Sequence, residues 1–175
     1  SAVAQYAVLY YTVMVADIFV GTLAQGWIPR AREASTNRSL APQGFFRFTL
    51  KTSLTWSLIM LPVALIGIAL AALLLPLLFG SEYRMTLGVA IPIAAAILIM
   101  PILNFASMAI IVLNLYIPAI TVSAVSAAAS LALGAILIPI WGVQGAFWTF
   151  ALAAAFRALP GLILVQRSER REDPV

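Results

Sequence analysis

Charged side chains gather at a few places in this chain and leave long stretches almost free of charge. Of its ten Lys and Arg residues, five lie between Arg30 and Lys51 and three between Arg167 and Arg171. A charge is costly inside the hydrocarbon of a bilayer, so charged residues collect where water is present. We therefore predict that the uncharged stretches cross a membrane.

The amino-acid composition supports this interpretation. The chain is 63% hydrophobic, whereas soluble domains are about 45–50% apolar. A soluble fold of this size cannot bury so much apolar surface, so lipid is the expected solvent. The net charge of +4 rests on few basic residues that are confined mainly to connections. This excess predicts contact with lipid headgroups and no binding of nucleic acid.

Five segments are long and apolar enough to cross the bilayer as helices, which takes about 20 residues each. They cover residues 5–29, 52–79, 85–113, 118–138 and 143–166. Their length and lack of alternating polarity exclude the strands of a membrane barrel. We predict an all-α membrane protein in which a loop at 30–51 follows the first span, an uncharged turn at 139–142 joins the last two, and a tail covers 167–175.

The basic clusters also predict an orientation, because cytoplasmic connections are enriched in Lys and Arg. Placing the loop 30–51 in the cytoplasm brings the tail 167–175 to the same side after four more crossings. Eight Lys and Arg are then inside and one, Arg84, is outside. The odd number of spans leaves Ser1 outside, and the chain begins directly in apolar sequence. We expect it to be a fragment of a protein with further spans upstream.

The residue types present exclude several kinds of chemistry. The chain has no Cys and no His, which removes thiol nucleophiles, His metal ligands and Ser/His/Asp triads. No glycine-rich phosphate loop appears. We therefore predict no enzymatic activity, no catalytic residue, no metal and no cofactor. The acids Glu33, Glu169, Glu172 and Asp173 lie among cations on the predicted cytoplasmic side, where we expect them to be solvated.

Two ionisable residues fall inside the predicted spans. Asp17 lies about twelve residues before the inner end of its span, or about 18 Å, and Arg157 about nine residues before Gln166, or about 13 Å. Such residues are functional candidates. Arg157 suits an anionic headgroup such as a diphosphate, and Asp17 suits a proton or Na⁺ as coupling ion. Alternatively, Arg157 snorkels to the interface or pairs with Asp17, or Asp17 is protonated.

Two polar residues inside the spans, Asn104 and Gln25, are further candidates for contact with a substrate. Either of them can equally serve as an interhelical hydrogen bond, because polar side chains also join helices inside membranes.

Two stretches carry a family resemblance: residues 74–83, LLPLLFGSEY, and residues 138–146, IPIWGVQGA. The pair resembles the C-terminal half of bacterial polysaccharide flippases, the O-antigen and exopolysaccharide transporters of the multidrug/oligosaccharidyl-lipid/polysaccharide superfamily. That family repeats an LFG-x-x-Y turn and a later IP-x-x-G-x-x-GA turn. The start of the first span, Gln5-Tyr6-Ala7, and its end, Trp27-Ile28-Pro29-Arg30, are also similar to the family's preceding helix.

The resemblance implies that the five helices form most of the C-terminal six-helix lobe of a flippase-like transporter. In a twelve-span plan of that family they would be the eighth to the twelfth spans. The implied function is to flip a lipid-linked oligosaccharide across the bacterial inner membrane by alternating access, with the C-terminus in the cytoplasm. Its partners would be that substrate, membrane lipids and the missing N-terminal lobe. A cation-coupled multidrug exporter of the same superfamily and a non-transporting membrane scaffold are the alternatives.

Overall fold

The computed structural model describes residues 2–37, 41 and 44–172, and this part of the chain is almost entirely helical. Its elements are α1 (Ala2–Thr36), α2 (Phe45–Phe79), the short 3₁₀ helix η1 (Ser81–Tyr83), α3 (Leu87–Val112) and α4 (Tyr116–Glu172). The described residues contain no strand, and each of the four long helices is apolar enough to cross a bilayer. The fold is that of an all-α membrane protein, as the sequence predicts.

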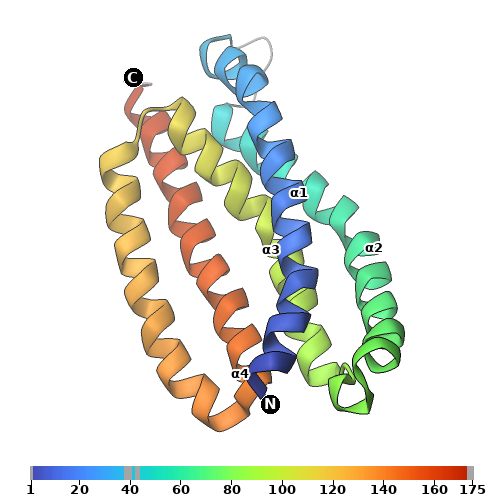
Figure 1. Cartoon of the computed structure of the whole chain (residues 1–175). Helices are drawn as coiled ribbons and strands as arrows, with labels where there is room; N and C mark the ends of the chain where they lie inside the picture. Colours follow the sequence, from blue (N-terminus) through green and yellow to red (C-terminus); the bar gives the residue numbers. More distant parts are fainter. Residues whose placement is uncertain (1, 38–40, 42–43, 173–175) are drawn as a thin grey trace.

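Within the described residues the number of long helices is four, and the prediction of five was wrong. Residues 118–138 and 143–166 belong to one helix, α4, of 57 residues. A straight helix of that length would measure about 85 Å, almost three times the hydrocarbon core of about 30 Å. Instead α4 doubles back at Gly142 (φ 56°, ψ −128°) and forms two antiparallel arms (Figure 1). We call residues 116–141 the first arm and residues 143–172 the second arm.

The bend of α4 depends on two glycines. Gly142 adopts positive φ, which costs little only for glycine. At Gly145, a Cβ atom would collide with the carbonyl group of Leu137, so the missing side chain lets the two arms approach each other. The turn predicted at 139–142 therefore contracts to one non-helical residue, and no loop separates the arms.

The connections are shorter than the predicted loop and tail because the helices continue past the apolar segments. Residues 30–36 belong to α1, residues 45–51 to α2 and residues 167–172 to α4. The C-terminal end of α1, the N-terminal end of α2, the α3–α4 turn and the C-terminal end of α4 lie at one end of the bundle (Figure 1). We call it the basic end, because the described residues Arg30, Arg32, Arg47, Lys51, Arg167 and Arg170 belong to these helix ends. The N-terminal end of α1, η1 and the bend of α4 lie at the other end.

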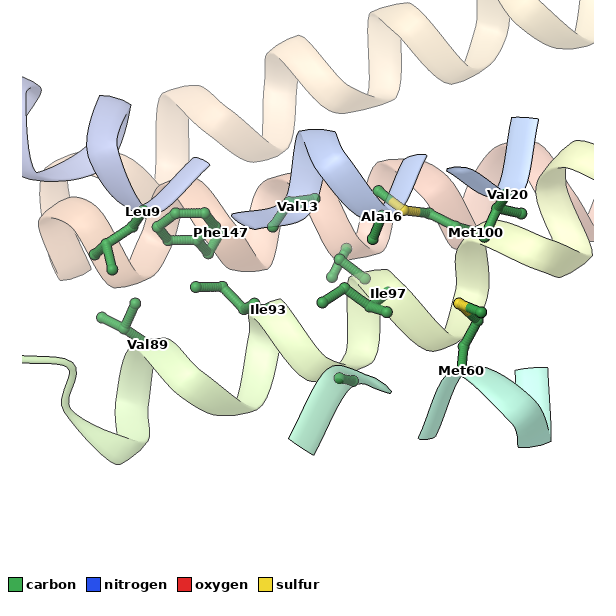
Figure 2. Close-up of a cluster of buried hydrophobic side chains, with 13 residues drawn as sticks. Leu9, Val13, Ala16, Val20, Met60, Val89, Ile93, Ile97, Met100 and Phe147 are labelled. Carbon is green, nitrogen blue, oxygen red and sulfur yellow. The ribbon is translucent and has the colours of Figure 1, made fainter. Parts of the chain in front are cut away.

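The central helix of the bundle is α3, which packs against α1, α2 and α4. Toward the end opposite the basic end, side chains of α1, α3 and α4 such as Leu9, Ile93 and Phe147 form a buried cluster (Figure 2). A second cluster lies at the basic end, where Trp27 stacks on Phe48 and meets Phe105 edge to face. Much of the remaining apolar surface is exposed, especially on α2 and the first arm, as expected where lipid is the solvent.

Candidate functional site

Asp17 and Asn104 meet where α1 crosses α3. The side-chain amide of Asn104 donates a hydrogen bond to the Asp17 carboxylate (3.2 Å) and another to the carbonyl group of Met100 (3.1 Å). The second bond fixes the amide on its own helix, so that it presents a donor to the carboxylate. Asp17 is otherwise exposed on the surface of α1. The carboxylate is thus accessible, and one polar neighbour orients it.

Arg157 lies on the second arm of α4 and is also exposed. Its side chain lines two hollows between α3 and the two arms. The larger one, of about 520 Å³, contains Tyr116, Ser123 and Gly161. The smaller one, of about 230 Å³, contains Leu103, Ser126 and Ser130. The guanidinium group therefore stands where these two spaces meet, next to the small side chains of the first arm.

The two ionisable residues lie at the same level of the bundle but are not paired. Leu103 shares a hollow with Arg157, and the next residue, Asn104, contacts Asp17. Consecutive side chains of a helix point about 100° apart, so Asp17 and Arg157 contact different faces of α3. No ion pair joins them in the part of the chain that the structure describes. The arrangement therefore gives no support to a structural Asp17–Arg157 pair.

Most hydroxyl groups around Arg157 already donate hydrogen bonds to backbone carbonyl groups. Ser126 donates to Phe156 (3.2 Å), which ties the two arms together, and Ser130 donates to Ser126 (2.6 Å). Among the described residues, neither Arg157 nor Ser123 has such a partner. These two donors remain available to a ligand, and a guanidinium group together with a hydroxyl group suits phosphate oxygens.

Gln25 is not part of this arrangement. It is exposed on α1 and lies eight residues after Asp17, about 12 Å along the helix. It lines neither of the hollows beside Arg157. Of the four predicted site residues, the structure brings together only Asp17 and Asn104, with Arg157 nearby on another face of α3. Within the described residues, no group of three or more acidic side chains is placed to hold a metal ion.

The role of Glu169 was not predicted from the sequence. This half-buried carboxylate accepts hydrogen bonds from the backbone N–H groups of Phe45 (2.7 Å) and Phe46 (3.1 Å) at the start of α2. The expectation that it is solvated was wrong. The signal was a helix start without a local cap: Gly44 precedes it, and Gly44 has no side chain to satisfy the first N–H groups. A distant acceptor has to do so.

Neither a protein-family model, nor a curated protein, nor a solved structure matches this chain.

Proposed function

We propose that this chain is part of a transporter that flips a lipid-linked oligosaccharide from the inner to the outer leaflet of the bacterial inner membrane by alternating access. In this proposal the basic end faces the cytoplasm. The observation that carries it is Arg157: an exposed guanidinium group without a protein partner in the described residues, about 13 Å in from the inner end of an apolar segment, beside two hollows. A cation inside an apolar membrane segment costs free energy, and binding an anion offsets that cost.

The larger hollow offers a route from the basic end to Arg157. Along the first arm it extends from Tyr116, the first residue of α4, to Ala124, a length of about 12 Å. An anionic headgroup that enters from the inner leaflet would follow this wall and meet Arg157 and Ser123. In the proposed mechanism Arg157 binds the diphosphate of the lipid carrier through its paired N–H donors, and the low dielectric of the site strengthens the attraction.

The proposed N-terminal lobe would cover the outward side of α1. That side carries Gln25 and large exposed apolar side chains such as Tyr11 and Val15, and Asp17 lies at its edge, next to α3. Polar residues inside membranes usually face a bundle interior or a cavity. In the proposal, Asp17 lies between the lobes and binds the coupling ion, and Asn104 orients its carboxylate.

Replacement of Arg157 in the complete transporter tests the proposal. We expect Arg157→Ala to lower the flipping of lipid-linked oligosaccharide about tenfold or more, because a hydrogen bond to a charged group contributes about 1.5–3 kcal/mol. Arg157→Lys should retain part of the activity. Arg84→Ala, at the opposite end of the bundle, is the matched control and should leave transport unchanged. Normal transport by Arg157→Ala at equal expression would refute the role.

Asp17 supports one second candidate, a cation-coupled drug exporter. An exposed carboxylate at this depth suits an apolar cation or its coupling ion. The two functions differ in the residue that contacts the substrate. If the protein is an exporter, Asp17→Asn abolishes the export of cationic drugs, and Arg157→Ala has little effect on it. If neither variant changes any transport activity, the chain is a membrane scaffold.

A further inference from the structure

A long groove runs between α2 and α3 on a side of the bundle away from Arg157. It has a volume of about 860 Å³. Its walls are mainly leucine and isoleucine side chains: Leu50, Leu54, Leu58, Leu61, Leu98, Ile99 and Ile102. None of its lining residues also lines the hollows beside Arg157. The groove is therefore distinct from the site of the proposed transport function.

Two cations stand at the mouth of the groove, near the basic end. Arg47 and Lys51 both line it and both are exposed. They are four residues apart on α2, a spacing that places two side chains on the same face of a helix. Among the described residues, no acidic side chain lines the groove. The mouth therefore carries two positive charges on the same face of α2.

Below these cations the groove is apolar because its hydroxyl groups are already bonded. Thr55 donates to the carbonyl group of Lys51 (2.9 Å), and Ser57 donates across the helix contact to the carbonyl group of Leu98 (2.9 Å). The groove is also open to the surroundings, since Leu58 on its wall is 73% exposed. It thus combines a cationic mouth with an apolar channel that faces the bilayer.

The length of the groove matches a lipid chain. From Arg47 to Leu61 it follows α2 for 14 residues, about 21 Å. One leaflet contributes about 15 Å of hydrocarbon, half of the core. With Arg47 placed at the headgroup level, where a cation is expected, the groove would reach slightly past the middle of the membrane.

We propose that this groove binds one anionic glycerophospholipid of the surrounding leaflet. Its phosphate contacts Arg47 and Lys51, and one acyl chain lies between α2 and α3. Charge complementarity favours an anionic headgroup over a zwitterionic one, and basic pockets between membrane helices are suited to such headgroups. This inference does not depend on the transport function, because it uses other residues on another side of the bundle.

Native mass spectrometry of the purified full chain in detergent tests this site, with phosphatidylglycerol and phosphatidylcholine of identical acyl chains as probes. We expect one phosphatidylglycerol to be retained in preference to phosphatidylcholine. The double variant Arg47→Gln/Lys51→Gln should bind phosphatidylglycerol about 30-fold more weakly, given the attraction of each cation near an anionic headgroup. Arg30→Gln/Arg32→Gln removes two exposed cations from α1 at the same end and should bind normally.

A second measurement locates the lipid without altering the cations. Leu58→Trp places a fluorophore on the groove wall, and Leu77→Trp places one on α2 outside the groove as a control. Phosphatidylglycerol with brominated acyl chains should quench the added Trp at position 58 at lower lipid fractions than brominated phosphatidylcholine does, with no such preference at position 77. Equal quenching by both lipids at position 58, or equal affinity of the Arg47/Lys51 variant, overturns the proposal. Preferential binding of a polyprenyl phosphate over phosphatidylglycerol would also overturn it, since the groove would then hold a carrier lipid.

Discussion

The carboxylate of Glu169 accepts a hydrogen bond from the backbone N–H group of Phe45 at 2.7 Å and thereby joins the end of α4 to the start of α2. The two residues are 124 positions apart in the sequence. The first N–H groups of a helix lack intrahelical partners and carry partial positive charge, so a carboxylate is well suited to this position. This contact fastens two helices to each other at the basic end.

We expect Glu169→Ala to lower the free energy of unfolding by about 1–2 kcal/mol, the usual cost of losing an N-terminal cap. Glu169→Gln should cost less, because its amide oxygen still accepts one hydrogen bond. Unfolding in mixed micelles, followed by Trp fluorescence, measures the difference. The control is Glu33→Gln, which removes an exposed acid near the end of α1. An equal effect of Glu33→Gln and Glu169→Ala would mean that net charge, and not the cap, is responsible.

Gly44 leaves room for this cap. Its φ of 93° and ψ of 155° lie in a region almost restricted to glycine, and a Cβ atom there would collide with Glu169. Gly80 has nearly the same backbone conformation (φ 97°, ψ 166°) but open space around it. Both Gly→Ala variants therefore share a backbone cost of about 1–3 kcal/mol. We expect Gly44→Ala to lose about 1–2 kcal/mol more, because it also displaces the cap. Equal unfolding free energies for the two variants would contradict this account.

The contact between Asp17 and Asn104 should be measurable as a coupling energy. We expect a double-mutant cycle of Asp17→Ala and Asn104→Ala to give about 0.6 kcal/mol of favourable coupling, which is typical of hydrogen bonds between membrane helices. The readout is again the unfolding free energy in mixed micelles. A cycle of Asp17→Ala with Arg157→Ala serves as the comparison. It should give almost no coupling, because these two residues contact different faces of α3.

The fold could be predicted from the distribution of charge, but not in full. Long uncharged segments predict helices in a membrane, and the basic clusters predict which ends lie together. The predicted number of helices was wrong because of residues 139–142, where a single glycine with positive φ reverses the direction of the helix without a loop. Such a reversal requires the two arms of α4 to approach each other closely. They can do so only because Gly145 has no side chain.

The candidate site was predictable only in part for a similar reason. Asp17 and Arg157 stand out because a charge in an apolar segment is rare. The partners of polar groups follow from packing: Asn104 lies 87 residues from Asp17, and Glu169 lies still farther from Phe45. No local pattern encodes either pairing. The missing local cap before Phe45 indicates that an acceptor is needed but does not identify it.

Labelling with a thiol reagent tests the orientation, because the chain contains no Cys and each introduced Cys is therefore unique. Ser81, in η1, and Arg32, near the end of α1, are both exposed and lie at opposite ends of the bundle. If the basic end faces the cytoplasm, a membrane-impermeant maleimide should label Ser81→Cys in intact cells and Arg32→Cys only after permeabilisation. The unmodified chain controls for background labelling. Labelling of Arg32→Cys alone in intact cells would show that the basic end faces the outside of the cell. The larger hollow would then open toward the outer leaflet.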